Sequence, residues 1–119
     1  MKRSEYFETR YDSDFVELSL VNPMYFGVLQ FEELRDELLE FVDNLRPHKV
    51  LVNFTQVRFC STAIITSLLI VKERIESYGG QLRLCGLNEA VRDSFTMLKL
   101  DGTVFKIHST AAGALADFS

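Results

Sequence analysis

The stretch Val50–Leu69, VLVNFTQVRFCSTAIITSLL, decides the fold class of this chain. Val50–Phe54 is a short apolar run typical of a buried strand, and a longer run with helical spacing begins at Thr62. Cys60 and Ser61 precede this helix, so a thiol and two hydroxyls lie between the strand and the first helical turn. In open α/β sheets, ligands and chemistry usually lie at this edge. The polar break is therefore the first candidate site.

Length and composition limit the class of protein. The chain has 119 residues, of which 47% are hydrophobic and 25% are charged, as in soluble globular domains. We expect residues 1–119 to form one domain with its own core. The formal net charge of −4 does not favour a nucleic-acid surface, which needs a basic excess. No apolar run is long enough to span a membrane, and the first residues, MKRSEYFETR, lack the apolar core of a signal peptide. These features predict a cytoplasmic protein with reduced cysteines.

The other sequence patterns alternate strands with helices. Two short runs on either side of Asp12–Asp14 predict a β-hairpin. Helical spacing predicts helices over residues 31–44, 62–78, 89–98 and 110–118, and apolar alternation predicts further strands over residues 50–54, 81–85 and 104–107. The order ββαβαβαβα predicts an α/β domain with a mixed, mostly parallel sheet of about five strands packed by about four helices.

Four motifs follow one another along this pattern. They are Val57–Ala63 (VRFCSTA), Gly79–Leu87 (GGQLRLCGL), Val91–Phe95 (VRDSF) and Leu100–Ile107 (LDGTVFKI). In this order and spacing they resemble the STAS domain of anti-sigma factor antagonists, and the resemblance covers about the whole chain. It implies a single STAS domain over residues 1–119.

The resemblance also implies a function. Members of the family are generally not enzymes. We expect neither a cofactor nor a metal in this chain. They bind an anti-sigma factor that is also a serine/threonine kinase, phosphorylation ends this complex, and a phosphatase restores it. The family motif D-S-[ST]-G falls on Ser61–Ile64, which makes Thr62 the phosphoacceptor candidate and Ser61 the second choice. Ser61 replaces the family's aspartate and Ile64 its glycine.

A second segment is a candidate for partner binding. In relatives, the loop after the second strand carries an aspartate used at the kinase contact, whereas here it contains Met24, Tyr25 and Phe26 and no acid. If exposed, these side chains form an apolar patch that favours a protein partner, and the alternative is that they fill the core under the first helix. We expect a partner surface made of Met24, Tyr25, Phe26, Cys60, Ser61, Thr62 and Ala63. The sequence also leaves a homodimer open.

Two alternatives for the polar break involve no phosphorylation. Ser61 and Thr62 are both suited to capping the helix, and capping alone would explain one of them. A degenerate STAS scaffold would bind a partner through the same surface without a phosphate.

A third alternative is a small cysteine-dependent enzyme. Cys60 lies just before a helix, where a thiol pKa can fall. A nucleophilic thiol also needs a base. We expect His48 to lie at the opposite end of the strand and His108 to have no acid that orients it, which leaves Cys60 as a small buried residue. Cys60 and Cys85 alone do not make a zinc site.

Overall fold

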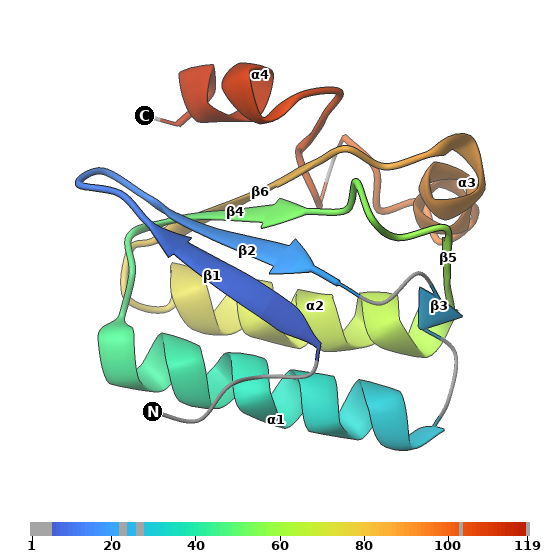
Figure 1. The fold of residues 1–119 in the computed structure, drawn as a ribbon, viewed down its shortest axis with the longest axis horizontal. Coiled ribbons are helices and arrows are strands. Elements are labelled where there is room, and N and C mark those ends of the chain that lie inside the picture. The colour runs from blue at the N-terminus through green and yellow to red at the C-terminus, as the bar shows by residue number, and fades with distance from the viewer. Residues whose placement is uncertain (1–5, 22–23, 26–27, 103, 119) are drawn as a thin grey trace.

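The computed structural model describes residues 6–21, 24–25, 28–102 and 104–118. These residues form a five-stranded sheet with the strand order β1-β2-β4-β6-β7 (Figure 1). Its strands are β1 (Phe7–Tyr11), β2 (Val16–Leu20), β4 (Lys49–Asn53), β6 (Gln81–Cys85) and β7 (Ile107–His108). The hairpin pair β1–β2 is antiparallel, and the pairs β2–β4, β4–β6 and β6–β7 are parallel. The predicted mixed, mostly parallel sheet is therefore confirmed.

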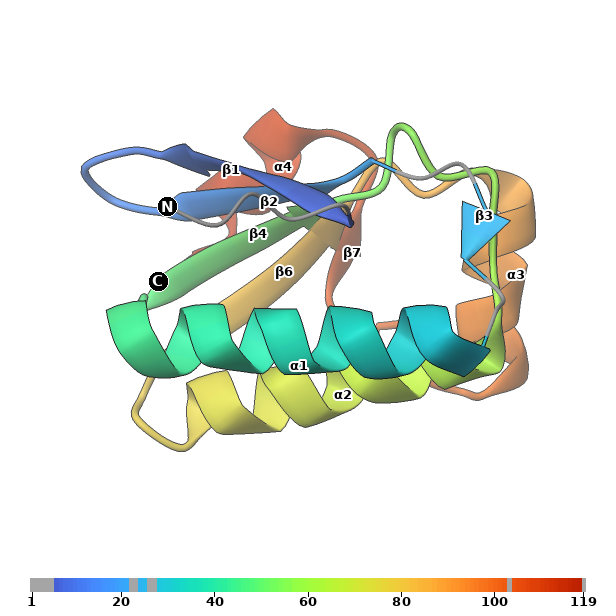
Figure 2. The ribbon, with the colours of Figure 1, turned by 60° about the horizontal axis from the view of Figure 1, so that its bottom comes forward.

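Helices cover both faces of this sheet. α1 (Val28–Leu45) and α2 (Thr62–Glu76) pack side by side under one face (Figures 1 and 2). α4 (Ala111–Ala116) lies on the other face, against β4, β6 and β7. α3 (Glu89–Met97) lies at the end of the sheet toward which the parallel strands run. The predicted α/β class with four helices is confirmed for the described part of the chain.

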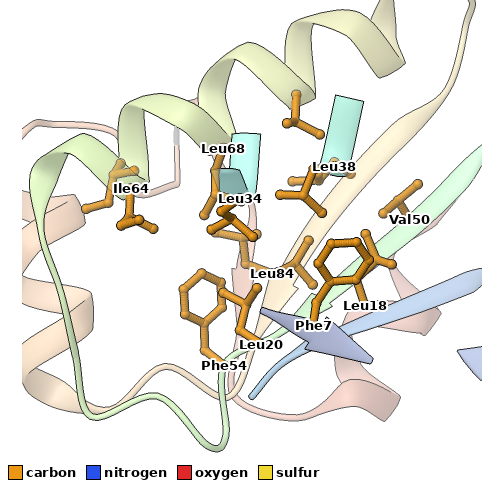
Figure 3. Close-up of a cluster of buried hydrophobic side chains, with 14 of the residues drawn as sticks. Phe7, Leu18, Leu20, Leu34, Leu38, Val50, Phe54, Ile64, Leu68 and Leu84 are labelled. Carbon is orange, nitrogen blue, oxygen red and sulfur yellow. The ribbon is translucent and has the colours of Figure 1, made fainter. Parts of the chain in front are cut away.

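The main core lies between the sheet and the pair α1–α2 (Figure 3). Leu34 and Leu38 of α1 and Leu68 of α2 are at most 1% exposed, which confirms the helical spacing seen in the sequence. In β6 the alternation separates the two faces: Leu82 and Leu84 belong to this core, while Cys85 packs in a smaller cluster under α4.

The structure differs from the prediction chiefly in α1, in the last strand and in a second, smaller sheet. α1 begins at Val28 rather than residue 31. The last strand is Ile107–His108 rather than residues 104–107, because Phe105 closes a turn: its amide donates to the Leu100 carbonyl at 2.8 Å. Two further strands, β3 (Met24–Tyr25) and β5 (Phe59–Cys60), form a small separate parallel sheet.

A buried carboxylate on the α4 side of the sheet makes stability depend on pH. Glu17 accepts hydrogen bonds from Arg10 Nη2 at 2.6 Å and from Asn53 Nδ2 at 2.8 Å. Burial alone would raise the Glu17 pKa, but the bonds from Asn53 and Arg10, with the Arg10 charge, hold it below its ordinary value. The ionised Glu17 carboxylate therefore stabilises the folded state fully at pH values above its unfolded-state pKa. This stabilisation is lost as the pH falls through the lower folded-state pKa of Glu17.

We therefore expect the urea midpoint of the wild-type protein to fall as pH drops below the ordinary pKa of glutamate. Glu17→Gln should lower the midpoint at neutral pH and flatten this acid-side decline, because the variant has no carboxyl to protonate. Urea titrations over a pH series measure both effects, and Glu40→Gln at an exposed position of α1 is the control. An acid-side decline as steep in Glu17→Gln as in the wild type contradicts this account.

Candidate functional site

The candidate site forms where β4 leads through residues 54–58 into β5 and α2. In the small parallel sheet, Met24 lies opposite Phe59 and Tyr25 opposite Cys60 (Figure 1). The structure thus brings together the two segments that the sequence suggested for partner binding. For Met24 and Tyr25 it describes the backbone, and Phe26 lies outside the described residues.

Asn88 holds the segment that leads to the site. As the N-cap of α3, its Oδ1 accepts the Val91 amide at 2.8 Å. Its Nδ2 donates to the carbonyls of Val57 at 3.3 Å and Arg58 at 3.1 Å. One side chain therefore begins α3 and fixes the chain directly before β5. Asn88 was not among the predicted site residues, although an asparagine before a helical pattern is a recognised cap signal.

Ser61 and Thr62 occupy different positions at the start of α2. Ser61 is the N-cap residue, with extended backbone angles φ −78° and ψ 164°. Its side chain makes no capping hydrogen bond, and its buried Oγ has no partner among the described residues. The hypothesis that the Ser61 hydroxyl caps the helix is therefore wrong. Thr62 is the first helical residue and is exposed, while Ala63 is half-buried.

The side chain of Ile64 points into the core. It is 0% exposed and belongs to the cluster between the sheet and the helices (Figure 3). The isoleucine that replaces the glycine of the family motif therefore adds no bulk around the exposed Thr62. Phe59, just before the site, is 39% exposed and is the large apolar side chain that β5 presents to solvent.

Cys60 is in the wrong environment for a nucleophile. Its side chain is 1% exposed, and burial raises the pKa of its thiol to about 12. A thiol with this pKa is almost entirely protonated at neutral pH, and the thiolate is the reactive form. Burial also means that Cys60 would contribute backbone rather than side chain to a partner surface.

The histidines do not supply the missing base. His48 precedes β4, at the amino end of the strand as expected, and its ring makes a T-shaped contact with the Tyr78 ring. For His108, the expectation that no acid orients it is wrong, because its Nε2 lies 3.2 Å from Asp117 Oδ2. This pair links β7 to α4 on one face of the sheet, whereas Cys60 packs in the core on the other face.

We predict that both cysteines resist alkylation in the native protein near neutral pH. Burial also raises the pKa of Cys85, to about 11, and that side chain is 0% exposed. Iodoacetamide labelling followed by intact mass should show modification of Cys60 and Cys85 only after denaturant is added. Fast stoichiometric labelling of Cys60 in the folded protein contradicts this and reopens the enzyme hypothesis.

The residues that the structure describes support neither a metal site nor a membrane-spanning helix. Within residues 6–21, 24–25, 28–102 and 104–118, no three His, Cys, Asp or Glu side chains are grouped as metal ligands. No helix in these ranges has the length and apolar character needed to cross a membrane. Cys60 and Cys85 pack in separate clusters.

Comparisons with known proteins agree with this architecture. Residues 6–114 match the family model of the STAS domain. No curated protein matches the chain. Among solved structures, TM1081 from Thermotoga maritima, assigned as an anti-sigma factor antagonist, is similar with a TM-score of 0.81 at 18% identity, covering 95% of this chain and 94% of that one.

Two further structures have the same fold. A variant of RsbS from Moorella thermoacetica is similar with a TM-score of 0.74 at 14% identity, covering 92% of both chains. The phosphorylated form of the Bacillus cell fate determinant SpoIIAA gives 0.67 at 16% identity, covering 92% of this chain and 96% of that one. Since the family model matches nearly the whole length, the chain belongs to the STAS domain family.

Proposed function

We propose that this chain is a non-catalytic protein-binding module that acts as an anti-sigma factor antagonist in a cytoplasmic partner-switching pathway. Its partner is an anti-sigma factor that is also a serine/threonine kinase. Phosphorylation of Thr62 ends the complex, and a phosphatase restores it. The observation that carries this proposal is the exposed Thr62 at the first position of α2, next to the β3–β5 pair.

The helix start explains how a phosphate could act as a switch without unfolding the domain. Phosphorylation of Thr62 adds about −1.5 to −2 charges. The first amides of α2 have no helical carbonyl partner, and the helix dipole favours negative charge there. The folded domain therefore tolerates the modification. In a close interface the same charge loses its water and repels acidic groups of the partner, which opposes binding.

The proposed partner surface is composite. Ser61, Thr62 and Ala63 would contribute from the start of α2, and Met24, Tyr25 and Phe26 from the β3 segment. The backbone pairing of β3 with β5 supports this grouping, because it holds Tyr25 beside Cys60. The solved structure of SpoIIAA in a phosphorylated form shows that a protein with a similar fold carries this modification.

Phosphate mapping tests the proposal. The protein is incubated with ATP and with each purified anti-sigma factor kinase of its source organism, and the site is located by fragment mass analysis. We expect one phosphate on Thr62, lost in Thr62→Val and retained in Thr66→Val, an exposed threonine one turn further along α2. A kinase that modifies a known substrate but leaves Thr62 unmodified contradicts the phosphoacceptor assignment. A phosphate found on Ser61 instead would make Ser61, the second candidate, the phosphoacceptor.

The degenerate scaffold is the second candidate function. Ser61 stands where the family motif has an aspartate, and its buried Oγ offers no charge beside Thr62. In this case the same surface binds a partner, but kinase and ATP leave the complex intact.

A further inference from the structure

α4 covers a small apolar cluster on the face of the sheet opposite to α1 and α2 (Figure 1). Leu51 of β4, Cys85 of β6 and Ala114 of α4 are each 0% exposed and form a cluster of their own, separate from the main core. Partly buried side chains of the α4 segment pack against this cluster, namely Ala111, Leu115 and Phe118. The cover over this face of the sheet is therefore made by one short segment, residues 111–118.

The apolar packing that holds α4 in place is weak. Its sequence, AAGALA, offers mostly methyl groups, and Ala114 is its buried residue. A helix of six residues does not form stably on its own in water, so α4 keeps its shape through docking. α2, by contrast, buries Ile64, Leu68 and Ile75 among its core residues. Opening α4 therefore breaks much less apolar contact than opening α2 would.

A polar bridge adds to this packing at the end of α4. Asp117 is the C-cap residue, and its Oδ2 accepts a hydrogen bond from Arg83 Nε of β6 at 2.8 Å. The same oxygen lies 3.2 Å from His108 Nε2 of β7. The Arg83 side chain is 11% exposed, and its guanidinium lies over the Phe118 ring, 5.3 Å from the centroid. Removing the carboxylate would leave a largely covered cation without its ion-pair partner, which disfavours the closed position of α4.

We propose that α4 opens from the sheet as a unit while the main core stays folded, and that the bridge through Asp117 is the latch that keeps it closed. Local openings of this kind involve elements with few buried apolar contacts. Opening exposes the Cys85 thiol, whereas Cys60 lies in the main core on the other face and is exposed by unfolding of the whole domain. The latch thereby controls access to Cys85 and to the sheet face around Leu51.

Thiol labelling of the wild-type protein tests the opening. The protein is pulsed with iodoacetamide at urea concentrations below its unfolding midpoint, and the modified cysteine is identified by fragment mass analysis. Each rate is divided by the rate of the same cysteine in the unfolded chain, which gives the exposed fraction of that thiol. We expect a larger exposed fraction for Cys85 than for Cys60, with a weaker dependence on urea, because opening α4 exposes less surface than global unfolding does. Equal exposed fractions of the two thiols at every urea concentration overturn the proposal.

The variant Asp117→Asn tests the latch. We expect the exposed fraction of Cys85 at low urea to rise about tenfold or more, as the loss of a hydrogen bond to a charged group implies. The matched control is Asp43→Asn, which removes the ion pair with Arg74 between α1 and α2. This pair persists when α4 opens, so the control should leave the exposed fraction of Cys85 at the wild-type value. An unchanged Cys85 in Asp117→Asn, or an equal rise in Asp43→Asn, overturns the proposal. Neither experiment contains a kinase, so the outcome is independent of the proposed function.

Discussion

Replacing Thr62 by glutamate is expected to weaken binding to the anti-sigma factor kinase by about 100-fold or more. Thr62 is exposed at the first position of α2, within the surface proposed for the partner. An unpaired charge buried in an interface costs about 3–5 kcal/mol, and each 1.4 kcal/mol changes affinity about tenfold. Isothermal titration of the purified partner measures the effect. The variant should keep its fold, since a negative charge is favourable in the first turn of a helix.

The matched control for this variant is Thr62→Gln, which adds a side chain of similar size without the charge. We expect it to lose much less affinity than Thr62→Glu. Equal losses in the two variants would point to steric exclusion rather than charge. An unchanged affinity in Thr62→Glu would contradict the switch and favour the scaffold that binds without phosphorylation.

The largest loss of stability is expected from Phe95→Ala. Phe95 is 0% exposed and packs edge-to-face against Phe54, with centroids 6.1 Å apart, and against Phe105, at 5.3 Å. These three rings join α3 to the segments that follow β4 and precede β7. Truncating a buried phenylalanine costs about 3–5 kcal/mol of unfolding free energy. Urea unfolding followed by circular dichroism measures this loss.

Met97→Ala is the control for Phe95→Ala. Met97 lies on the same helix, two residues further on, and is 80% exposed. We expect its unfolding free energy to stay within about 0.5 kcal/mol of the wild type. A similar loss in both variants would mean that lower stability of α3 itself, and not the aromatic cluster, determines the result.

Local patterns were sufficient to predict most of the fold. The strand alternation of β2 and β6 and the helical spacing of α2 are properties of neighbouring residues, and each pattern matches a buried face in the structure. The glycine pair Gly79–Gly80 predicted where α2 stops to within two residues, since the helix was expected to reach residue 78 and ends at Glu76. The Gly79 amide donates to the Glu76 carbonyl and the Gly80 amide to the Ile75 carbonyl.

The site was less accessible from the sequence, because its parts meet through long-range contacts. β3 and β5 are each two residues long, which is too short for a periodic signal. They pair with one another although α1 and β4 lie between them in the sequence. The hydrogen bonds from Asn88 to the carbonyls of Val57 and Arg58 are also long-range, because α2 and β6 lie between these residues in the sequence. The His108–Asp117 contact depends on how α4 docks onto the sheet. Such contacts are determined by tertiary packing, so no local sequence pattern predicts which residues will meet.

Addition of ATP to the preformed complex with the anti-sigma factor kinase shows whether phosphorylation of Thr62 controls binding. The fraction of bound protein is followed over time by size-exclusion chromatography or fluorescence anisotropy, in parallel for the wild type and Thr62→Val. We predict that ATP dissociates the wild-type complex while the Thr62→Val complex persists, because the valine has no hydroxyl to accept a phosphate. Equal dissociation of the two complexes, or a wild-type complex that survives ATP with an active kinase, would rule out Thr62 as the switch.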